Sequence, residues 1–116
     1  MVQEARFPQF RQSMLFSLHR GILLEIPIPT IVTEEYYAVD YMNRYYVGRA
    51  LSIANKLVKF KFLHRVGSDR FHWPRTDDID VVHMSCVFYG PVALENAGPF
   101  AVPMQHDIEK IFSLTR

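Results

Sequence analysis

The chain has 116 residues, with 13 Lys and Arg against 12 Asp and Glu, which gives a formal net charge of +1. This length fits a single domain, and the balance of charge argues against nucleic-acid binding through a general basic excess. The one cysteine, Cys86, excludes an intrachain disulfide and a cluster of thiolate metal ligands, and it favours a reducing compartment.

Residues 7–20 are predicted to form an amphipathic helix. Pro8 suits the first helical position and Gly21 is a plausible stop. Apolar side chains recur between them at spacings of three and four, namely at Phe7, Phe10, Met14 and Leu18. Such a helix packs on its own domain or, because Leu15 and Phe16 widen its apolar face, binds a partner or a second copy of the chain.

The first 20 residues carry charges along their whole length and lack the apolar core and cleavage site of a signal peptide. No apolar run approaches the ~20 residues that a membrane span needs. We therefore expect an intracellular protein without a membrane segment. Residues 22–33 follow, and Pro27 and Pro29 exclude a helix or a central strand there, so an extended arm along the domain surface is predicted.

Five short strands are predicted next, separated by tight turns, over residues 36–40, 45–53, 57–66, 70–73 and 81–89. Short strands so close together favour a closed or nearly closed barrel, because closure removes exposed edges. Gly48, in the middle of the second strand, fits a sharp bend.

Alternation along the strands predicts which side chains face the core. In the second strand the predicted core face consists of Tyr45, Val47, Leu51 and Ile53. The opposite face places Tyr46 beside Gly48, which predicts an open shelf there. In the third strand the inward residues are Val58, Phe60 and Phe62, and Cys86 on the fifth strand is predicted to be core.

Residues 105–115 are predicted to form a short helix that covers one opening of the barrel. The predicted organisation is an N-terminal helix and extended arm (1–33), a barrel (34–92), and a loop with a C-terminal helix that packs on the barrel (93–116). The fold class is mainly β with flanking helices at both ends.

Residues 38–53 (AVDYMNRYYVGRALSI) and 57–64 (LVKFKFLH) resemble the first three strands of tudor domains. The resemblance implies a small five-stranded SH3/tudor-like barrel that binds methylated lysine or arginine, for example in a histone-like tail, within an aromatic cage. The cage residues that it implies are Tyr41, Tyr46, Phe62 and Phe71, with Trp73 as a neighbour on the same face. A methylated ammonium would be held there by cation–π attraction, and a chromatin ligand would imply a nuclear location.

Residues 71–80 (FHWPRTDDID), with the YYVGRAL and KFLH segments before them, are similar to a C-terminal domain of uncharacterised transposon-derived animal proteins. This resemblance covers residues 36–90. It is compatible with an accessory domain that contacts nucleic acid through cations interleaved with aromatic rings, here Lys59, Lys61, His64, Arg65 and Arg70. The same residues also suit a solvated strand face whose lysines protect a sheet edge.

Catalysis and metal binding are not expected. Asp77, Asp78 and Asp80 lie so close together that capping and turn roles explain them, and the histidines lack metal-ligand spacing. The sequence thus predicts a binding module without a cofactor that recognises a protein segment. Two alternatives stay open, a nucleic-acid-contacting domain and a structural or homodimer-forming domain.

Overall fold

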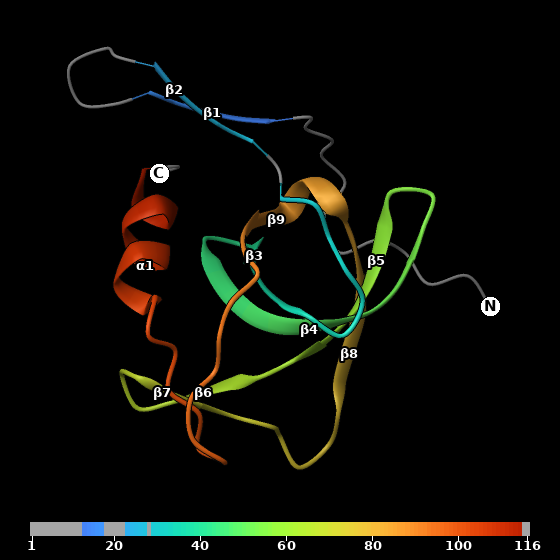
Figure 1. Ribbon diagram of the computed structural model, residues 1–116, viewed down its shortest axis with the longest axis vertical. Helices are drawn as coiled ribbons and strands as arrows, with labels where there is room; N and C mark the ends of the chain where they lie inside the picture. The colour runs from blue at the N-terminus through green and yellow to red at the C-terminus, as the bar shows by residue number, and fades with distance from the viewer. Residues whose placement is uncertain (1–12, 18–22, 28, 115–116) are drawn as a thin grey trace.

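The computed structural model of the chain describes residues 13–17, 23–27 and 29–114. The protein is mainly β, with one five-stranded antiparallel sheet, two separate two-stranded sheets, a 3-10 turn and a C-terminal helix (Figure 1). The strands of the large sheet lie in the order β8-β5-β4-β3-β9. Their bounds are Tyr36–Tyr41 for β3, Arg44–Ala54 for β4, Leu57–Phe62 for β5, Asp78–His83 for β8 and Val87–Tyr89 for β9.

The N-terminal part is a hairpin of β1 (Ser13–Ser17) and β2 (Leu23–Pro27), paired antiparallel from Ser13↔Pro27 to Ser17↔Leu23. The helix predicted over residues 7–20 is therefore wrong at 13–17, and its other residues lie outside the described ones. The apolar spacing of residues 13–17 is compatible with a helix, but these residues pair with β2 instead. Pro27 favours an extended conformation in β2, which makes it a suitable partner strand. That segment was predicted to be extended, and the prediction is confirmed at β2.

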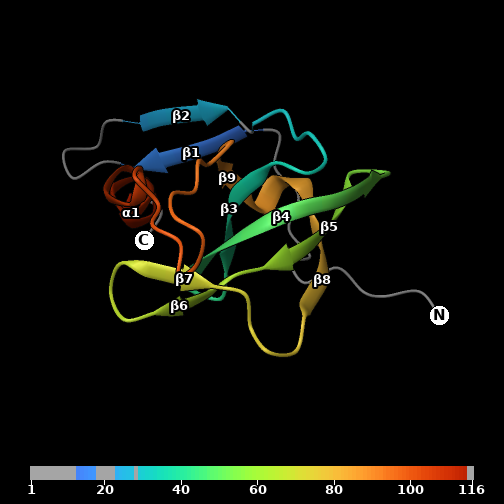
Figure 2. The ribbon, with the colours of Figure 1, turned by 60° about the horizontal axis from the view of Figure 1, so that its bottom comes forward.

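The long strand β4 is shared by two halves of the sheet. It pairs with β3 from Arg44 to Arg49 and with β5 from Gly48 to Ala54. A register shift between Ala50 and Ser52 marks a bulge, which bends a strand and increases its twist. Figure 1 shows β4 as a strongly curved ribbon, and Figure 2 shows its length between β3 and β5.

Two-residue turns close the hairpins on both sides of β4. Met42 and Asn43 have φ of 47° and 64°, and Asn55 and Lys56 have φ of 52° and 67°. Two successive positive φ values are those of a type I′ turn, whose twist matches that of paired strands, and Asn tolerates this conformation. Both turns were predicted and both are confirmed.

The third and fifth predicted strands are each interrupted. The third ends at Phe62, and Leu63 leads into β6 (His64–Val66), which pairs with β7 (Arg70–His72) in a separate hairpin. The predicted fourth strand thus lies outside the large sheet. The fourth strand of that sheet along the chain is β8, which begins where only a turn was predicted.

The 3-10 turn η1 (Met84–Cys86) separates β8 from β9, within the predicted fifth strand. The His83 side chain accepts a hydrogen bond from the Ser85 amide at 3.0 Å, which caps this turn. A side chain that bonds the backbone two residues ahead competes with strand pairing, and this local bond ends β8.

Both faces of the large sheet are covered. One core cluster includes Tyr37, Val39, Ala50 and Phe62, and the other includes Val47, Leu63, Phe71, Phe88 and Ile108. The predicted inward residues of β5 are confirmed, since Val58, Phe60 and Phe62 are all inaccessible to solvent, and Cys86 is also buried.

On the predicted core face of β4, Val47 is buried and Tyr45 and Leu51 are half-buried, but the prediction is wrong at Ile53. Ile53 is 40% exposed, whereas Gly48 and Ala50, predicted to face outward, are buried. A Cβ atom at Gly48 would stand 2.8 Å from Cδ1 of Phe62, so the expected open shelf is filled by that ring. Alternation fails because the curved strand is covered on both faces and shifts register at its bulge.

The C-terminal helix α1 (Gln105–Ser113) is confirmed close to its predicted bounds, and residues 115–116 lie outside the described ones. Ile108 is fully buried, and the Phe112 ring lies 5.8 Å from that of Phe88 and 5.5 Å from that of Tyr45. These contacts fix α1 beside the start of β4. No helix within the described ranges is long and apolar enough to cross a membrane.

Candidate functional site

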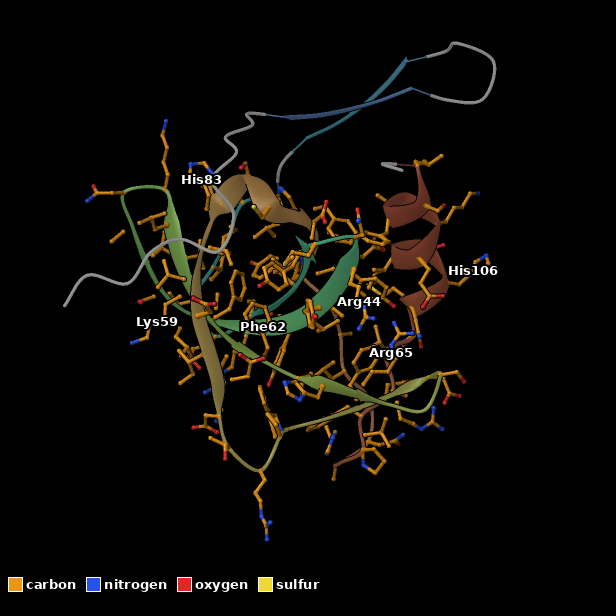
Figure 3. All side chains as sticks on the ribbon, turned by 180° about the vertical axis from the view of Figure 1, so that it is seen from behind. Arg44, Lys59, Phe62, Arg65, His83 and His106 are labelled. Atoms are coloured by element: carbon orange, nitrogen blue, oxygen red, sulfur yellow. The ribbon has the colours of Figure 1, made fainter. Side chains whose placement is uncertain are left out.

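The aromatic residues expected to form a cage fall into three places. Tyr41, Tyr46 and Phe62 form a row, with ring centroids 5.8 Å apart for the first pair and 6.0 Å for the second. We call these three residues the aromatic row. Phe62 has no exposed surface, and Figure 3 shows it within the body of the molecule.

The other two expected cage residues lie elsewhere. Phe71 is 3% exposed and belongs to the core cluster on the opposite face of the sheet. The Trp73 ring packs 6.2 Å from that of Tyr36, with the Lys61 ammonium 4.8 Å and the Arg49 guanidinium 5.9 Å from its centroid. The five side chains therefore do not surround a common open pocket.

A cleft of about 450 Å³ opens beside the aromatic row, between the start of β4, the β6–β7 hairpin and α1. This volume is within the range of small-ligand and peptide side-chain pockets. Aromatic and charged side chains line it, namely Arg44, Tyr45, Tyr46, Leu63, Arg65, Phe71, Glu109 and Phe112. Figure 3 shows Arg44 and Arg65 near α1, with Phe62 further inside the sheet.

Three of these residues form a hydrogen-bonded group that we call the cleft cluster: Tyr45, Arg65 and Glu109. Arg65 Nη2 donates to the Tyr45 hydroxyl at 2.6 Å, and this hydroxyl donates to Glu109 Oε2 at 2.8 Å. Arg65 Nη2 also lies 3.3 Å from the same carboxylate oxygen. The cluster joins β4, β6 and α1, which are far apart in the sequence.

Gln105 completes the arrangement from one turn earlier in α1. Its Nε2 donates to Glu109 Oε2 at 3.1 Å and to the backbone oxygen of Ser68 at 2.8 Å. Three donor groups thus converge on one carboxylate oxygen. A carboxylate that accepts several hydrogen bonds is held in its charged form.

The environment sets the protonation of both acids in the cluster. Burial, reinforced by the hydrogen bond to Glu109, raises the pKa of Tyr45 from 10.0 to about 12. Burial alone would raise the pKa of Glu109, but hydrogen bonds from Tyr45 and Gln105 and the charge of Arg65 outweigh it and lower that pKa. At neutral pH the phenol is therefore a proton donor and the carboxylate is ionised.

The aromatic faces of the cleft already hold a cation. The Arg65 guanidinium carbon lies 5.2 Å from the centroid of the Tyr45 ring and 5.4 Å from that of Phe71. These distances are typical of cation–π contacts. A methylated ammonium could reach the same ring faces only by displacing Arg65.

The charges of the cleft are unequal. Arg65 is paired with Glu109, whereas Arg44 is exposed and no ion pair joins it to another of the described residues. The cleft therefore carries two cations and one carboxylate, which favours an anionic ligand.

Most of the basic residues considered for nucleic-acid binding stand beside a carboxylate. Their pairs are Lys61 with Asp77 at 3.6 Å, His64 with Asp78 at 3.0 Å, Arg65 with Glu109 at 3.3 Å and Arg70 with Asp69 at 3.4 Å. Lys59 is exposed on β5. These pairings neutralise much of the basic charge, so the five residues do not make a continuous positive surface.

The carboxylates Asp77 and Asp78 therefore act as ion-pair partners of neighbouring strands. Asp80 Oδ1 accepts a hydrogen bond from the Val81 amide at 2.8 Å, which is a local turn-like contact. Within residues 13–17, 23–27 and 29–114, no group of three or more His, Cys, Asp or Glu side chains could hold a metal ion.

Three of the eight lining residues, Tyr46, Arg65 and Phe71, are predicted site residues. The other five carry no functional prediction from the sequence: Arg44, Tyr45, Leu63, Glu109 and Phe112. Only contacts between β4 and α1, 64 residues apart in the Tyr45–Glu109 hydrogen bond, bring them together. No local spacing carries that information.

No protein-family model, curated protein or solved structure matches this chain. The resemblances to tudor domains and to transposon-derived proteins consequently stay predictions, and any functional assignment depends on the geometry of the site itself.

Proposed function

We propose that the chain is a non-catalytic binding module, an SH3-like barrel that holds a protein segment in the cleft between β4, the β6–β7 hairpin and α1. The barrel is supported by the pairing of β3 with β9, the first and last strands of the large sheet along the chain. It is also supported by the bend of β4, because a strand shared by both halves of a sheet must curve for the sheet to wrap around a core.

The observation that carries the function is the cleft itself. Its lining combines half-buried aromatic rings, Tyr46 and Phe112 among them, with charged side chains. Such a combination is typical of sites in which an apolar anchor supplies binding energy and polar groups fix orientation. A protein segment with one large apolar side chain fits this chemistry.

Two features favour an ordinary protein segment over the other predicted ligands. A methylated lysine or arginine would compete with Arg65 for the ring faces and be repelled by Arg44. Nucleic acid would meet cations that already have carboxylate partners, so few counterions would be released from its phosphates on binding.

The proposal is tested by selecting binders from a displayed random peptide library and titrating the enriched synthetic peptides into ¹⁵N-labelled protein. The expected result is saturable movement of amide signals at Arg44, Tyr45, Arg65 and Phe71, with micromolar affinity. Enrichment of no peptide, or movement confined to residues outside the cleft, would overturn the proposal. Trimethyl-lysine peptides and a DNA duplex, titrated in parallel, should leave the cleft signals in place.

A further inference from the structure

The cleft already holds a carboxylate and an aromatic ring of its own chain. Glu109 and Phe112, three residues apart on α1, both line it. The carboxylate accepts from Tyr45 and Arg65, and the ring packs on that of Tyr45. Residues three apart lie on the same face of a helix, so α1 presents an acid and an aromatic ring together.

The cations of the cleft retain hydrogen-bonding capacity beyond this internal pair. A guanidinium has five N–H donors. Arg65 uses only Nη2 toward Tyr45 and Glu109 within the described part of the chain. Arg44 adds a second exposed guanidinium at the same cleft. Two guanidinium groups around one cleft can hold a further carboxylate through charge-assisted hydrogen bonds.

We propose that the segment bound in the cleft carries an Asp or Glu side chain next to an aromatic residue, and that Glu109 competes with this ligand carboxylate for Arg65. The inference depends on the proposed function, whose ligand class it specifies. In the absence of a ligand, Glu109 satisfies Arg65 and lowers the affinity for weaker acidic segments. Binding brings the ligand carboxylate to Arg44 and to the unused donors of Arg65. The aromatic side chain of the ligand packs against the half-buried rings of Tyr46 and Phe112.

Three small probes share a phenylethyl group and differ in the charge of their terminal group, so they test the effect of ligand charge. They are 3-phenylpropionate, its neutral amide 3-phenylpropanamide, and phenylethyl-trimethylammonium. Each is titrated into ¹⁵N-labelled protein. The carboxylate should move the signals of Arg44, Tyr45 and Arg65 with millimolar affinity, the amide should bind about tenfold more weakly, and the ammonium should bind most weakly of the three. Equal binding of acid and amide, or strongest binding of the ammonium, would overturn the inference.

Two matched substitutions test whether the binding of 3-phenylpropionate depends on the cleft residue Arg44 or only on the net charge of the protein. Arg44→Gln should weaken 3-phenylpropionate binding about fivefold or more, whereas Arg75→Gln, which removes the same charge from an exposed residue outside the cleft, should change it less than about twofold. Equal losses in both variants would mean that only net charge is sensed, which contradicts the inference.

Glu109→Gln tests the competition. Removing the internal carboxylate should strengthen 3-phenylpropionate binding about threefold to tenfold, while binding of the amide changes little. Weaker acid binding in this variant would refute the competitive role of Glu109.

The two proposals fail differently. If library peptides bind in the cleft but acid and amide probes do not differ, the binding module stands and acid recognition is wrong. If the peptides bind elsewhere or none is enriched, the proposed function itself is wrong, whatever the probes show.

Discussion

The aromatic row and the cleft cluster begin at neighbouring residues of β4, and yet they differ in what their rings can do. Tyr46 lies between Tyr41 and Phe62 and packs against the core cluster that contains Phe60. Tyr45 packs against the other core cluster and joins Arg65 and Glu109 by its hydroxyl. Tyr46 thus packs between two other rings and also lines the cleft, whereas Tyr45 adds a hydroxyl that joins the cleft cluster.

The difference originates in what covers each face of β4. On the Tyr46 face, the missing side chain of Gly48 lets the Phe62 ring lie directly on the strand. On the Tyr45 face, the cover consists of α1 and the β6–β7 hairpin, which meet over the strand and leave a cleft between them. Both tyrosines line the cleft, but Tyr46 packs in a row of rings and Tyr45 belongs to a hydrogen-bonded cluster.

The largest effect is expected from breaking the aromatic row. Phe62→Ala removes a fully buried ring that contacts Tyr46 and Phe60, and it should cost about 3–5 kcal/mol of unfolding free energy through lost burial and a residual cavity. Urea unfolding followed by circular dichroism measures this. The exposed Ile53→Ala on β4 is the control and should cost less than about 0.5 kcal/mol. Equal losses in the two variants would contradict a packed row.

A smaller loss is expected from adding one carbon beneath the row. Gly48→Ala places a Cβ atom 2.8 Å from Cδ1 of Phe62 and 3.2 Å from the backbone oxygen of Lys61, so ring and strand must shift. Overpacking of this kind should cost about 1–3 kcal/mol in the same unfolding experiment. Ser52→Ala, exposed on the same strand, controls for the change in strand propensity. A more stable Gly48→Ala variant would show that Phe62 does not lie against β4.

The contrast between row and cleft also explains what the sequence could and could not predict. Alternation and the expected tight turns predicted β3, β4 and β5, and the pattern of residues 105–115 predicted the helix α1. Alternation failed along β4, because a strand buried on both faces has no polar side to reveal its orientation. Strand β1 lies within a segment predicted to be helical, because apolar residues at spacings of three and four match a helix as well.

The open shelf predicted beside Gly48 is absent for a related reason, although Tyr46 itself lines the cleft. Tyr46 was placed outside beside Gly48, on the assumption that a glycine leaves room for a ligand. Here the room is occupied by Phe62, and the cleft depends on the position of α1, which only tertiary contacts determine. A glycine in a strand indicates that another group approaches the backbone closely there. The local sequence does not show whether that group is a ligand or a side chain of the same chain.

A moderate effect is expected from separating the members of the cleft cluster. In a double-mutant cycle of Tyr45→Phe and Glu109→Gln, the coupling energy should be about 0.5–1 kcal/mol, because the hydrogen bond is charge-assisted but the carboxylate is nearly half exposed. Chemical unfolding of the four proteins gives this value. The ion pair of Lys61 and Asp77, whose atoms lie 3.6 Å apart, provides a comparison cycle, which should give the smaller coupling. A larger coupling in the comparison cycle would contradict the hydrogen-bonded arrangement of the cleft cluster.

The smallest effect is expected in the pH dependence of stability, and it concerns the phenol proton of Tyr45. Its pKa is raised to about 12 in the folded protein, against an ordinary value of 10.0, so the folded state keeps a proton that the unfolded state loses. Stability from this group is therefore complete below the ordinary value and falls as the pH rises from there toward the folded value. Unfolding free energy measured between these limits should fall more steeply in the parent protein than in Tyr45→Phe. Equal slopes in the parent and in Tyr45→Phe would contradict a pKa raised by burial and by the hydrogen bond to Glu109.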